Sequence, residues 1–144
     1  MLGSEHPDVA SSYSHIGIVY SAQGKYDEAL LQYQKGLEIE LRVLGSEHPD
    51  VAISYYNIGT VYRAQGKYEE ALLQYQANLE ISIRTYGHVH PLVALTKCNI
   101  GFALIDMGKK EEANDMFTQA AAARLTIFGA DHALTIESER LAAE

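Results

Sequence analysis

Apolar and polar positions follow one another along the chain with the period of an amphipathic helix. In the clearest stretch, apolar side chains recur three and four residues apart, and they form one stripe made of Tyr68, Ala71, Leu72, Tyr75, Leu79 and Ile83. The two-residue alternation that is typical of strands is not seen. The pattern therefore predicts an all-α protein.

Proline and glycine mark where these helices begin and end. Pro49 suits the first turn of a helix because its missing N–H is not needed there, and Asp50 favours the positive end of the helix dipole. Gly66 is suited to the left-handed C-cap of a helix that ends at about Ala64. A second helix is expected from about Tyr68. The glycines expected to end the other helices are Gly24, Gly45, Gly87, Gly108 and Gly129.

The whole pattern repeats every 42 residues. Residues 2–10 and 44–52 are identical, and the units 2–43 and 44–85 share 31 of their 42 positions. The register returns in a weaker form in unit 86–127 and in the partial unit 128–144. We expect these units to form one array that spans residues 1–144.

Two amphipathic helices joined by a short turn cannot bury both apolar stripes alone, whereas stacked pairs bury them continuously. The predicted fold is therefore all-α: a right-handed α-solenoid of three antiparallel helix pairs and a C-terminal capping helix, about seven helices in total. The segment 131–144 is the expected cap because its helix is more polar than its counterparts.

Each unit resembles the tetratricopeptide (TPR) repeat. In the second unit, the residues that carry the resemblance are Tyr55, Ile58, Gly59, Tyr62, Gly66, Tyr68, Ala71 and Tyr75. Small Gly59 and Ala71 are expected to let the two helices approach closely. The 42-residue unit, with Leu-Gly-x-x-His-Pro-x-Val-Ala before its first helix, is similar to that of kinesin light chains. The resemblance implies a non-enzymatic scaffold or adaptor that binds an extended peptide segment in a concave groove lined by the first helix of each unit.

The TPR pattern also implies which positions face that groove. They are Ser11, Ser14, Ile18, Ser21, Ile53, Tyr56, Thr60, Arg63, Leu95, Cys98, Phe102 and Ile105. Only Arg63 among them is charged, so an apolar or neutral peptide is the expected guest. The candidate peptide-binding residues are Ser14, His15, Tyr56, Asn57, Thr60, Arg63, Cys98, Asn99 and Phe102.

Three of these candidates allow two interpretations. The amides of Asn57 and Asn99 are suited to bonding with the backbone of a guest peptide, but they are equally suited to bonding with neighbouring helix or loop backbone. Tyr56 replaces Ser14 at the equivalent position, where an aromatic ring either anchors a ligand or packs within the repeat.

Catalytic and metal-binding patterns are weak. His6, His48, His90 and His132 recur at the repeat interval, but equivalent positions in stacked units lie roughly 10 Å apart, too far to share one zinc ion. A cap or loop role is expected for them instead. Cys98 and His15 belong to different units, and no residue at a known spacing orients them as a catalytic pair. No catalytic residue, metal or cofactor is therefore expected.

The composition of the chain limits the kinds of partner that it is expected to bind. The net charge of −8 disfavours nucleic acid and anionic membrane surfaces. No apolar run approaches the length of about 20 residues that crosses a bilayer, residues 1–9 do not resemble a signal peptide, and one cysteine is compatible with a reducing compartment. We expect a cytoplasmic protein with a protein or peptide partner. Self-association into a homo-oligomer, end to end or by swapping, is the alternative, because the first helix carries Ile16, Ile18 and Val19.

Overall fold

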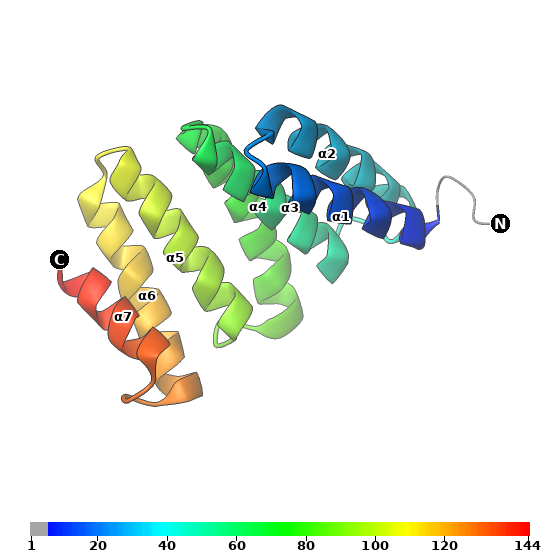
Figure 1. Cartoon of the computed structure of the whole chain (residues 1–144). Helices are drawn as coiled ribbons and strands as arrows, with labels where there is room; N and C mark the ends of the chain where they lie inside the picture. The colour runs from blue at the N-terminus through cyan, green and yellow to red at the C-terminus, as the bar shows by residue number, and fades with distance from the viewer. Residues whose placement is uncertain (1–5) are drawn as a thin grey trace. The chain divides into compact units, whose positions relative to one another are not determined.

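The computed structural model describes residues 6–144, which form seven α-helices and no strand (Figure 1). The helices are α1 (Pro7–Ala22), α2 (Tyr26–Val43), α3 (Pro49–Ala64), α4 (Tyr68–Tyr86), α5 (Pro91–Asp106), α6 (Lys110–Phe128) and α7 (Ala133–Ala143). The all-α fold is confirmed. The predicted boundaries at Pro49, Ala64 and Tyr68 are also confirmed.

The turns between helices depend on glycine. Gly24, Gly45, Gly66, Gly87, Gly108 and Gly129 have positive φ angles between 75° and 88°, and they are spaced 21 residues apart. A Cβ atom at these positions would meet nothing within 4 Å, so the requirement for glycine is one of backbone conformation and not of space. Each predicted helix end is confirmed.

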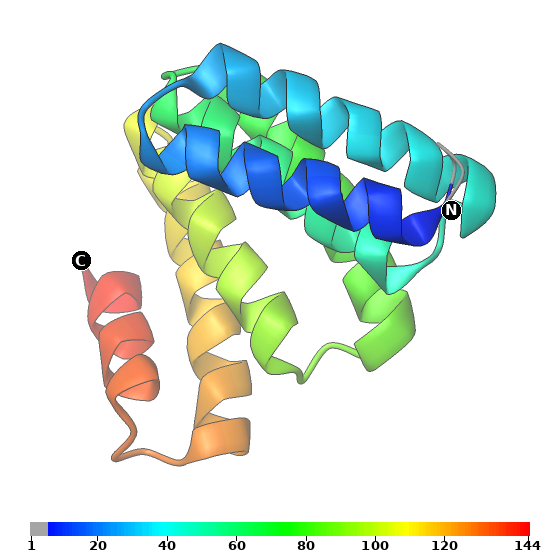
Figure 2. The same ribbon diagram turned by 45° about the vertical axis from the view of Figure 1, so that its right-hand side comes forward.

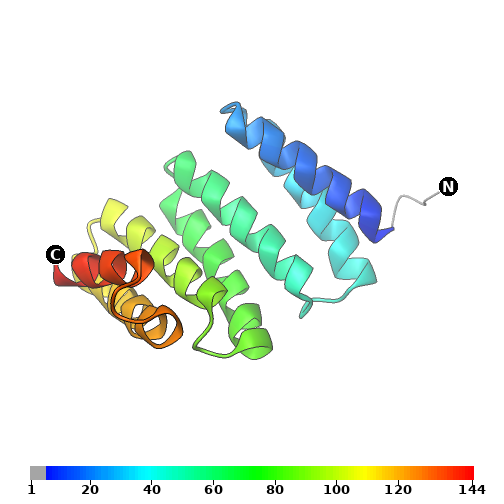
Figure 3. The same cartoon turned by 60° about the horizontal axis from the view of Figure 1, so that its bottom comes forward.

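The chain divides into two compact units, one reaching Ile81 and the other running from Ser82 to Glu144. In the first unit, α1 and α2 lie side by side and α2 also packs on α3 (Figures 1 and 2). In the second unit, α6 contacts both α5 and α7 (Figures 1 and 3). The first unit therefore holds α1, α2, α3 and most of α4, and the second holds the end of α4 with α5, α6 and α7.

Within a repeat, the two helices meet where a glycine faces an aromatic ring. A Cβ atom on Gly59 would lie 2.9 Å from the ring of Tyr75, which is 0% exposed. Since real Cβ atoms do not approach a ring so closely, the two backbones can come this near only because the residue is glycine. The close approach predicted at Gly59 is confirmed. The equivalent contacts are those of Gly17 with Tyr33 and of Gly101 with Phe117.

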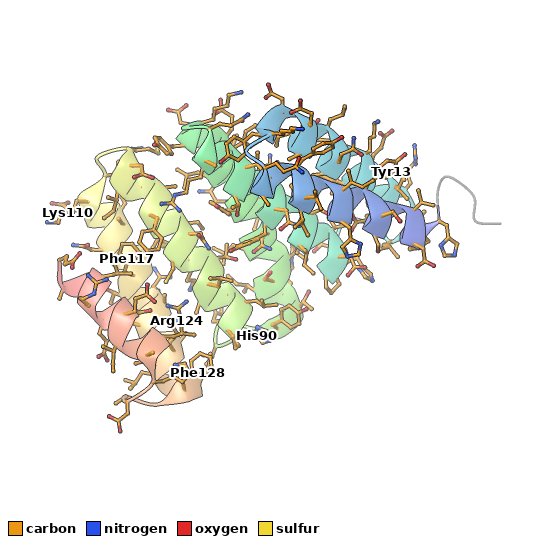
Figure 4. All side chains as sticks on the ribbon, in the orientation of Figure 1. Tyr13, His90, Lys110, Phe117, Arg124 and Phe128 are labelled. Carbon is orange, nitrogen blue, oxygen red and sulfur yellow. The ribbon has the colours of Figure 1, made fainter. Side chains whose placement is uncertain are left out.

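Successive repeats are joined by buried polar pairs whose members are 14 residues apart, which we call inter-repeat joints. In the first unit, the Ser54 hydroxyl donates to Glu40 Oε1 at 2.8 Å. In the second, Arg124 donates through Nη1 to the Ser138 hydroxyl at 2.6 Å and to the Leu134 carbonyl at 3.4 Å. Arg124 is labelled on α6 in Figure 4. Position 124 lies two repeats after position 40, so the two residues are equivalent. The same joint therefore contains an acidic residue, Glu40, in the first unit and a basic residue, Arg124, in the second.

The four recurring histidines cap helices. His6, His48, His90 and His132 each accept through Nδ1 the backbone N–H two residues further on, at 3.1 to 3.2 Å. This bond satisfies an N–H that the helix itself leaves without a partner. The expected cap role is confirmed, and each histidine serves its own helix.

Candidate functional site

The helix surfaces predicted to form a groove enclose a cavity of about 240 Å³ in the first unit. It lies between α1 and α3, and the end of α2 contributes to its wall. The residues that line it are Pro7, Ser11, Ser14, His15, Ile18, Glu40, Leu44, Asp50, Ile53, Ser54 and Asn57. We call it the A-helix cavity. It brings together three of the predicted site residues, Ser14, His15 and Asn57.

The wall of the A-helix cavity combines aliphatic side chains with polar and acidic ones. Ile18 and Ile53 are 50% and 52% exposed and supply its aliphatic surface. Glu40 also lines the cavity, although it is only 5% exposed and belongs to α2, which was not expected to contribute. Asp50 adds a second carboxylate, at the start of α3. The cavity therefore has both an aliphatic surface and two carboxylates in its wall.

Burial raises the pKa of the Glu40 carboxyl above its ordinary value, because the charged form loses hydration. The hydrogen bond from Ser54 lowers this pKa, the charge of Asp50 raises it, and His48 lowers it, each by less than burial does. The carboxyl group is held by one hydroxyl donor in a place that disfavours its charge. Its ionisation accordingly opposes folding.

Glu40→Gln is expected to raise the free energy of unfolding by about 1 kcal/mol at neutral pH, because the amide oxygen still accepts from Ser54 while the buried charge is removed. A raised folded-state pKa stabilises the wild type below the unfolded-state pKa, and this stabilisation is lost as pH rises through the folded-state value. Urea denaturation from about pH 4 to pH 8 should therefore show the wild type losing stability relative to Glu40→Gln. Glu28→Gln, at an exposed site of α2, should show the same change of unfolding free energy with pH as the wild type. The same pH dependence of the unfolding free energy in all three proteins would contradict the expectation.

Three other predicted residues of the first unit do not line the cavity. The ring of Tyr56 lies 5.8 Å from that of Tyr75, centroid to centroid. The hydroxyl of Thr60 donates to the Tyr56 carbonyl at 3.0 Å and lies 3.1 Å from the hydroxyl of Tyr75. Arg63 is half-buried and lies one turn after Thr60 and two turns after Tyr56. For Tyr56, packing within the repeat is thus observed.

In the second unit, the predicted residues Cys98, Asn99 and Phe102 make contacts within the protein. Asn99 donates through Nδ2 to the Leu95 carbonyl at 3.1 Å, which is the helix-backbone alternative for this side chain. The half-buried ring of Phe102 packs edge-on against Phe117, with centroids 5.2 Å apart.

Cys98 is only 4% exposed. Its Sγ lies 3.9 Å from the hydroxyl of Ser138 on α7. Burial raises the pKa of the Cys98 thiol; the nearby Arg124 charge and the Ser138 hydrogen bond lower it, and Glu137 raises it. Cys98 is therefore buried beside α7, and its expected place in the groove stays a prediction.

Because α7 covers Cys98, the cap at His132 should control how fast that thiol reacts. His132→Ala removes the acceptor for the Leu134 N–H and the stacking of His132 on Phe128, whose ring centroid lies 4.4 Å away. A lost N-cap costs about 1 kcal/mol, which corresponds to roughly fivefold more opening of α7. The rate of Cys98 modification by a disulfide reagent should rise about fivefold. In His132→Asn, which retains a cap acceptor, the modification rate should rise less. Equal modification rates in the wild type and both variants would show that α7 does not shield the thiol.

Residues 6–144 hold neither a metal-binding cluster nor a membrane-spanning helix. No three His, Cys, Asp or Glu side chains gather there in a way that would hold a metal ion. Within the same residues, no helix has both the length and the apolar character needed to cross a bilayer.

Comparisons with known proteins place the fold. One sequence profile of the tetratricopeptide repeat matches residues 9–50 and 93–134, and another matches residues 32–77. The chain belongs to the tetratricopeptide repeat family. No curated protein sequence matches it.

Solved structures of kinesin light chain-like repeats are among those that the fold resembles. The TPR-like repeats of a putative kinesin light chain from Podosopora anserina are 25% identical, with 99% of this chain and 68% of that chain covered and a TM-score of 0.85. BtubC (BKLC) from P. vanneervenii has the same fold, with 24% identity, 95% and 55% coverage and a TM-score of 0.87. PcrH, solved with the chaperone binding region of PopD, also shares the fold, with 20% identity, 99% and 95% coverage and a TM-score of 0.73.

Proposed function

We propose that this chain is a non-enzymatic protein-interaction module, a scaffold or adaptor, whose α1 and α3 surface binds an extended peptide segment of a partner protein. The observation that carries the proposal is the A-helix cavity, because Ser14, His15 and Asn57 line it where the TPR resemblance implies a groove. Membership of the TPR family supports a binding role, since such repeats commonly mediate interactions between proteins.

The size of the cavity favours a peptide over a small-molecule substrate. Ligand pockets usually measure about 300 to 1,000 Å³, whereas the A-helix cavity holds about 240 Å³, which suits one side chain of a longer guest. Beside it, the Ser14 hydroxyl and the Asn57 amide can each donate to and accept from a peptide backbone. Ile18 and Ile53 provide aliphatic contact. The chain thus offers backbone recognition next to a single side-chain pocket.

Over most of the α1 and α3 surface, the residues of these first helices favour an apolar or neutral partner. PcrH shows that a protein of the same fold can be solved with a segment of another protein bound. We also propose that the module acts in the cytoplasm, because its one thiol is buried and unpaired by any disulfide, which suits a reducing compartment.

A displayed library of random peptides, selected on the whole chain, tests this function. Selected peptides are expected to bind Ile53→Ser and Asn57→Ala about tenfold more weakly than the wild type, because each change removes a wall contact of the cavity. Serine occupies position 11, one repeat before Ile53, so the repeat accommodates it. The matched control is Leu73→Ala on α4, which is 65% exposed and does not line the cavity. No enriched peptide, or equal binding to all variants, would end the proposal.

A second candidate function, self-association, is favoured by the outer face of α1. Ile16 and Val19 are 44% and 55% exposed there, whereas their repeat equivalents Ile58 and Val61 are 2% and 1% exposed because they belong to the core that α2 forms with α3. A second copy of the chain would cover this face of α1 in a homodimer. Sedimentation velocity from about 5 to 500 µM should then show a mass that rises with concentration, and that does not rise for Val19→Asp. A constant monomer mass in the wild type would eliminate this candidate.

A further inference from the structure

We propose that the A-helix cavity receives the side chain of a lysine or arginine of the guest segment, with its cationic group on the Glu40 carboxylate and its aliphatic stem along Ile18 and Ile53. The inference rests on the proposed function, since a bound peptide is the source of that side chain. It assigns to the cavity a ligand chemistry that the first-helix residues alone do not indicate.

The first observation is a buried carboxylate without a cation. Glu40 is 5% exposed, it lines the cavity, and its Oε1 accepts the Ser54 hydroxyl. No Lys, Arg or His nitrogen of residues 6–144 lies within 4.0 Å of its carboxylate oxygens. A buried carboxylate is stable when it is paired with a cation and costly when it is not. A cationic guest would supply the missing partner.

The other inter-repeat joint shows that joining two repeats does not require this charge. At the equivalent position in the second unit, Arg124 bonds both the Ser138 hydroxyl and the Leu134 carbonyl, so its donors are used inside the protein. Ser82 occupies the intervening equivalent position with no charge at all. A structural role therefore accounts for the bond between Ser54 and Glu40 but not for the choice of a charged residue in the wall of the cavity.

The charges around the cavity favour a positive guest. Asp50 lines it from α3, and neither lysine nor arginine is among its lining residues. His15 lines it from α1. Nearby, His48 has its Nδ1 occupied by the N–H of Asp50 at 3.1 Å. Two carboxylates with no permanent cation between them attract an ammonium or guanidinium group.

The apolar part of the wall fits the rest of such a side chain. Lysine and arginine cover aliphatic surfaces with their methylene stems while the charged end reaches a polar partner. Ile18 and Ile53 are about half exposed on facing helices, and Leu44 lines the same cavity. An aliphatic side chain of the same length would fill the volume but leave Glu40 unpaired. The positive end should therefore contribute most of the selectivity.

The test uses small probes on the whole chain, so that it does not depend on finding a guest peptide. The probes are N-acetyl-lysine methylamide and its norleucine analogue, which has a similar stem and no charge, titrated against the protein and followed by NMR. The lysine probe is expected to shift the amides of Ser14 and Asn57 and to bind about tenfold more tightly than the norleucine probe. Glu40→Gln should lose about tenfold in affinity for the lysine probe and none for the norleucine probe.

The control is Glu28→Gln, which removes one negative charge from an exposed site of α2 and should bind both probes as the wild type does. Equal binding of the lysine probe to the wild type and Glu40→Gln would overturn the inference. So would an equal loss in Glu28→Gln, because binding would then follow net charge alone. If the peptide library yields no guest, the proposed function is wrong, but the lysine-probe titration still shows whether the cavity binds a cationic side chain. If the selected peptides contain no lysine or arginine and the lysine probe causes no amide shifts, only this inference is wrong.

Discussion

Replacing Tyr75 with alanine is expected to lower the free energy of unfolding by about 4 kcal/mol, as large aromatic deletions in a core do. Tyr75 is 0% exposed and lies against Gly59, where no other side chain can fill the space. Its ring contacts Tyr56 and its hydroxyl lies 3.1 Å from that of Thr60. Urea denaturation measures the loss, which is a large part of the roughly 5 to 15 kcal/mol that stabilises a domain.

Tyr75→Phe is the matched control for this change. It retains the ring and removes only the hydrogen bond with Thr60, so the expected loss is about 1 kcal/mol. Phenylalanine suits the position, because Phe117 occupies the equivalent place one repeat later and is also 0% exposed. If Tyr75→Ala were no worse than Tyr75→Phe, the helix pair would not depend on this ring.

The second large effect is expected at Gly101. Gly101→Val should destabilise the protein by about 3 kcal/mol, because even a Cβ atom there would lie 2.7 Å from the buried ring of Phe117. The valine must push α5 and α6 apart, because Phe117 on α6 is fully buried and its ring has no free space into which to move. The midpoint of urea or thermal denaturation gives the magnitude.

Two further variants test whether the loss of stability in Gly101→Val comes from the clash with Phe117. Ile105→Val, at a 45% exposed site on the same helix, places valine in α5 without a clash and should cost less than about 1 kcal/mol. In Gly101→Val with Phe117→Ala, the clash is removed, so the double variant should lose less than the sum of the single losses. Additive losses would show that the glycine and the ring do not act on each other.

Local rules made the helices predictable from sequence. Pro49 begins α3 because its ring is compatible with a first turn, and Gly66 follows the end of α3 with a φ of 77°. The contact of Gly59 with Tyr75 was also predictable, because the TPR pattern places a small residue there. All three depend on near neighbours in the sequence or on a motif that the repeat displays.

The candidate site was only partly predictable, because it depends on contacts between helices. Ser14, His15 and Asn57 meet at the cavity as first-helix positions, but Glu40 reaches it from α2. The available signal was a charged residue between Ile39 and Leu41, 14 residues before a serine, with the same spacing from Arg124 to Ser138.

Cys98 shows the second limit of a pattern averaged over repeats. Its position was expected to face the groove, but the thiol is short and the Ser138 hydroxyl of α7 lies 3.9 Å from it. The capping segment was predicted from its polarity, and its coverage of this residue was not. A position that lies at a surface in one repeat can therefore be covered in another, where the next helix packs close to a small side chain.

A guest peptide is expected to lie along α1 and α3 at the A-helix cavity. The backbone amide shifts of the whole chain on addition of the tightest-binding selected peptide will show whether this claim holds. The largest shifts are expected at Ser14, Ile53 and Asn57, and small ones at Leu73 on the exposed side of α4. Shifts concentrated at Leu73 or on the outer face of α1 around Val19, with none at the cavity, would contradict the claim.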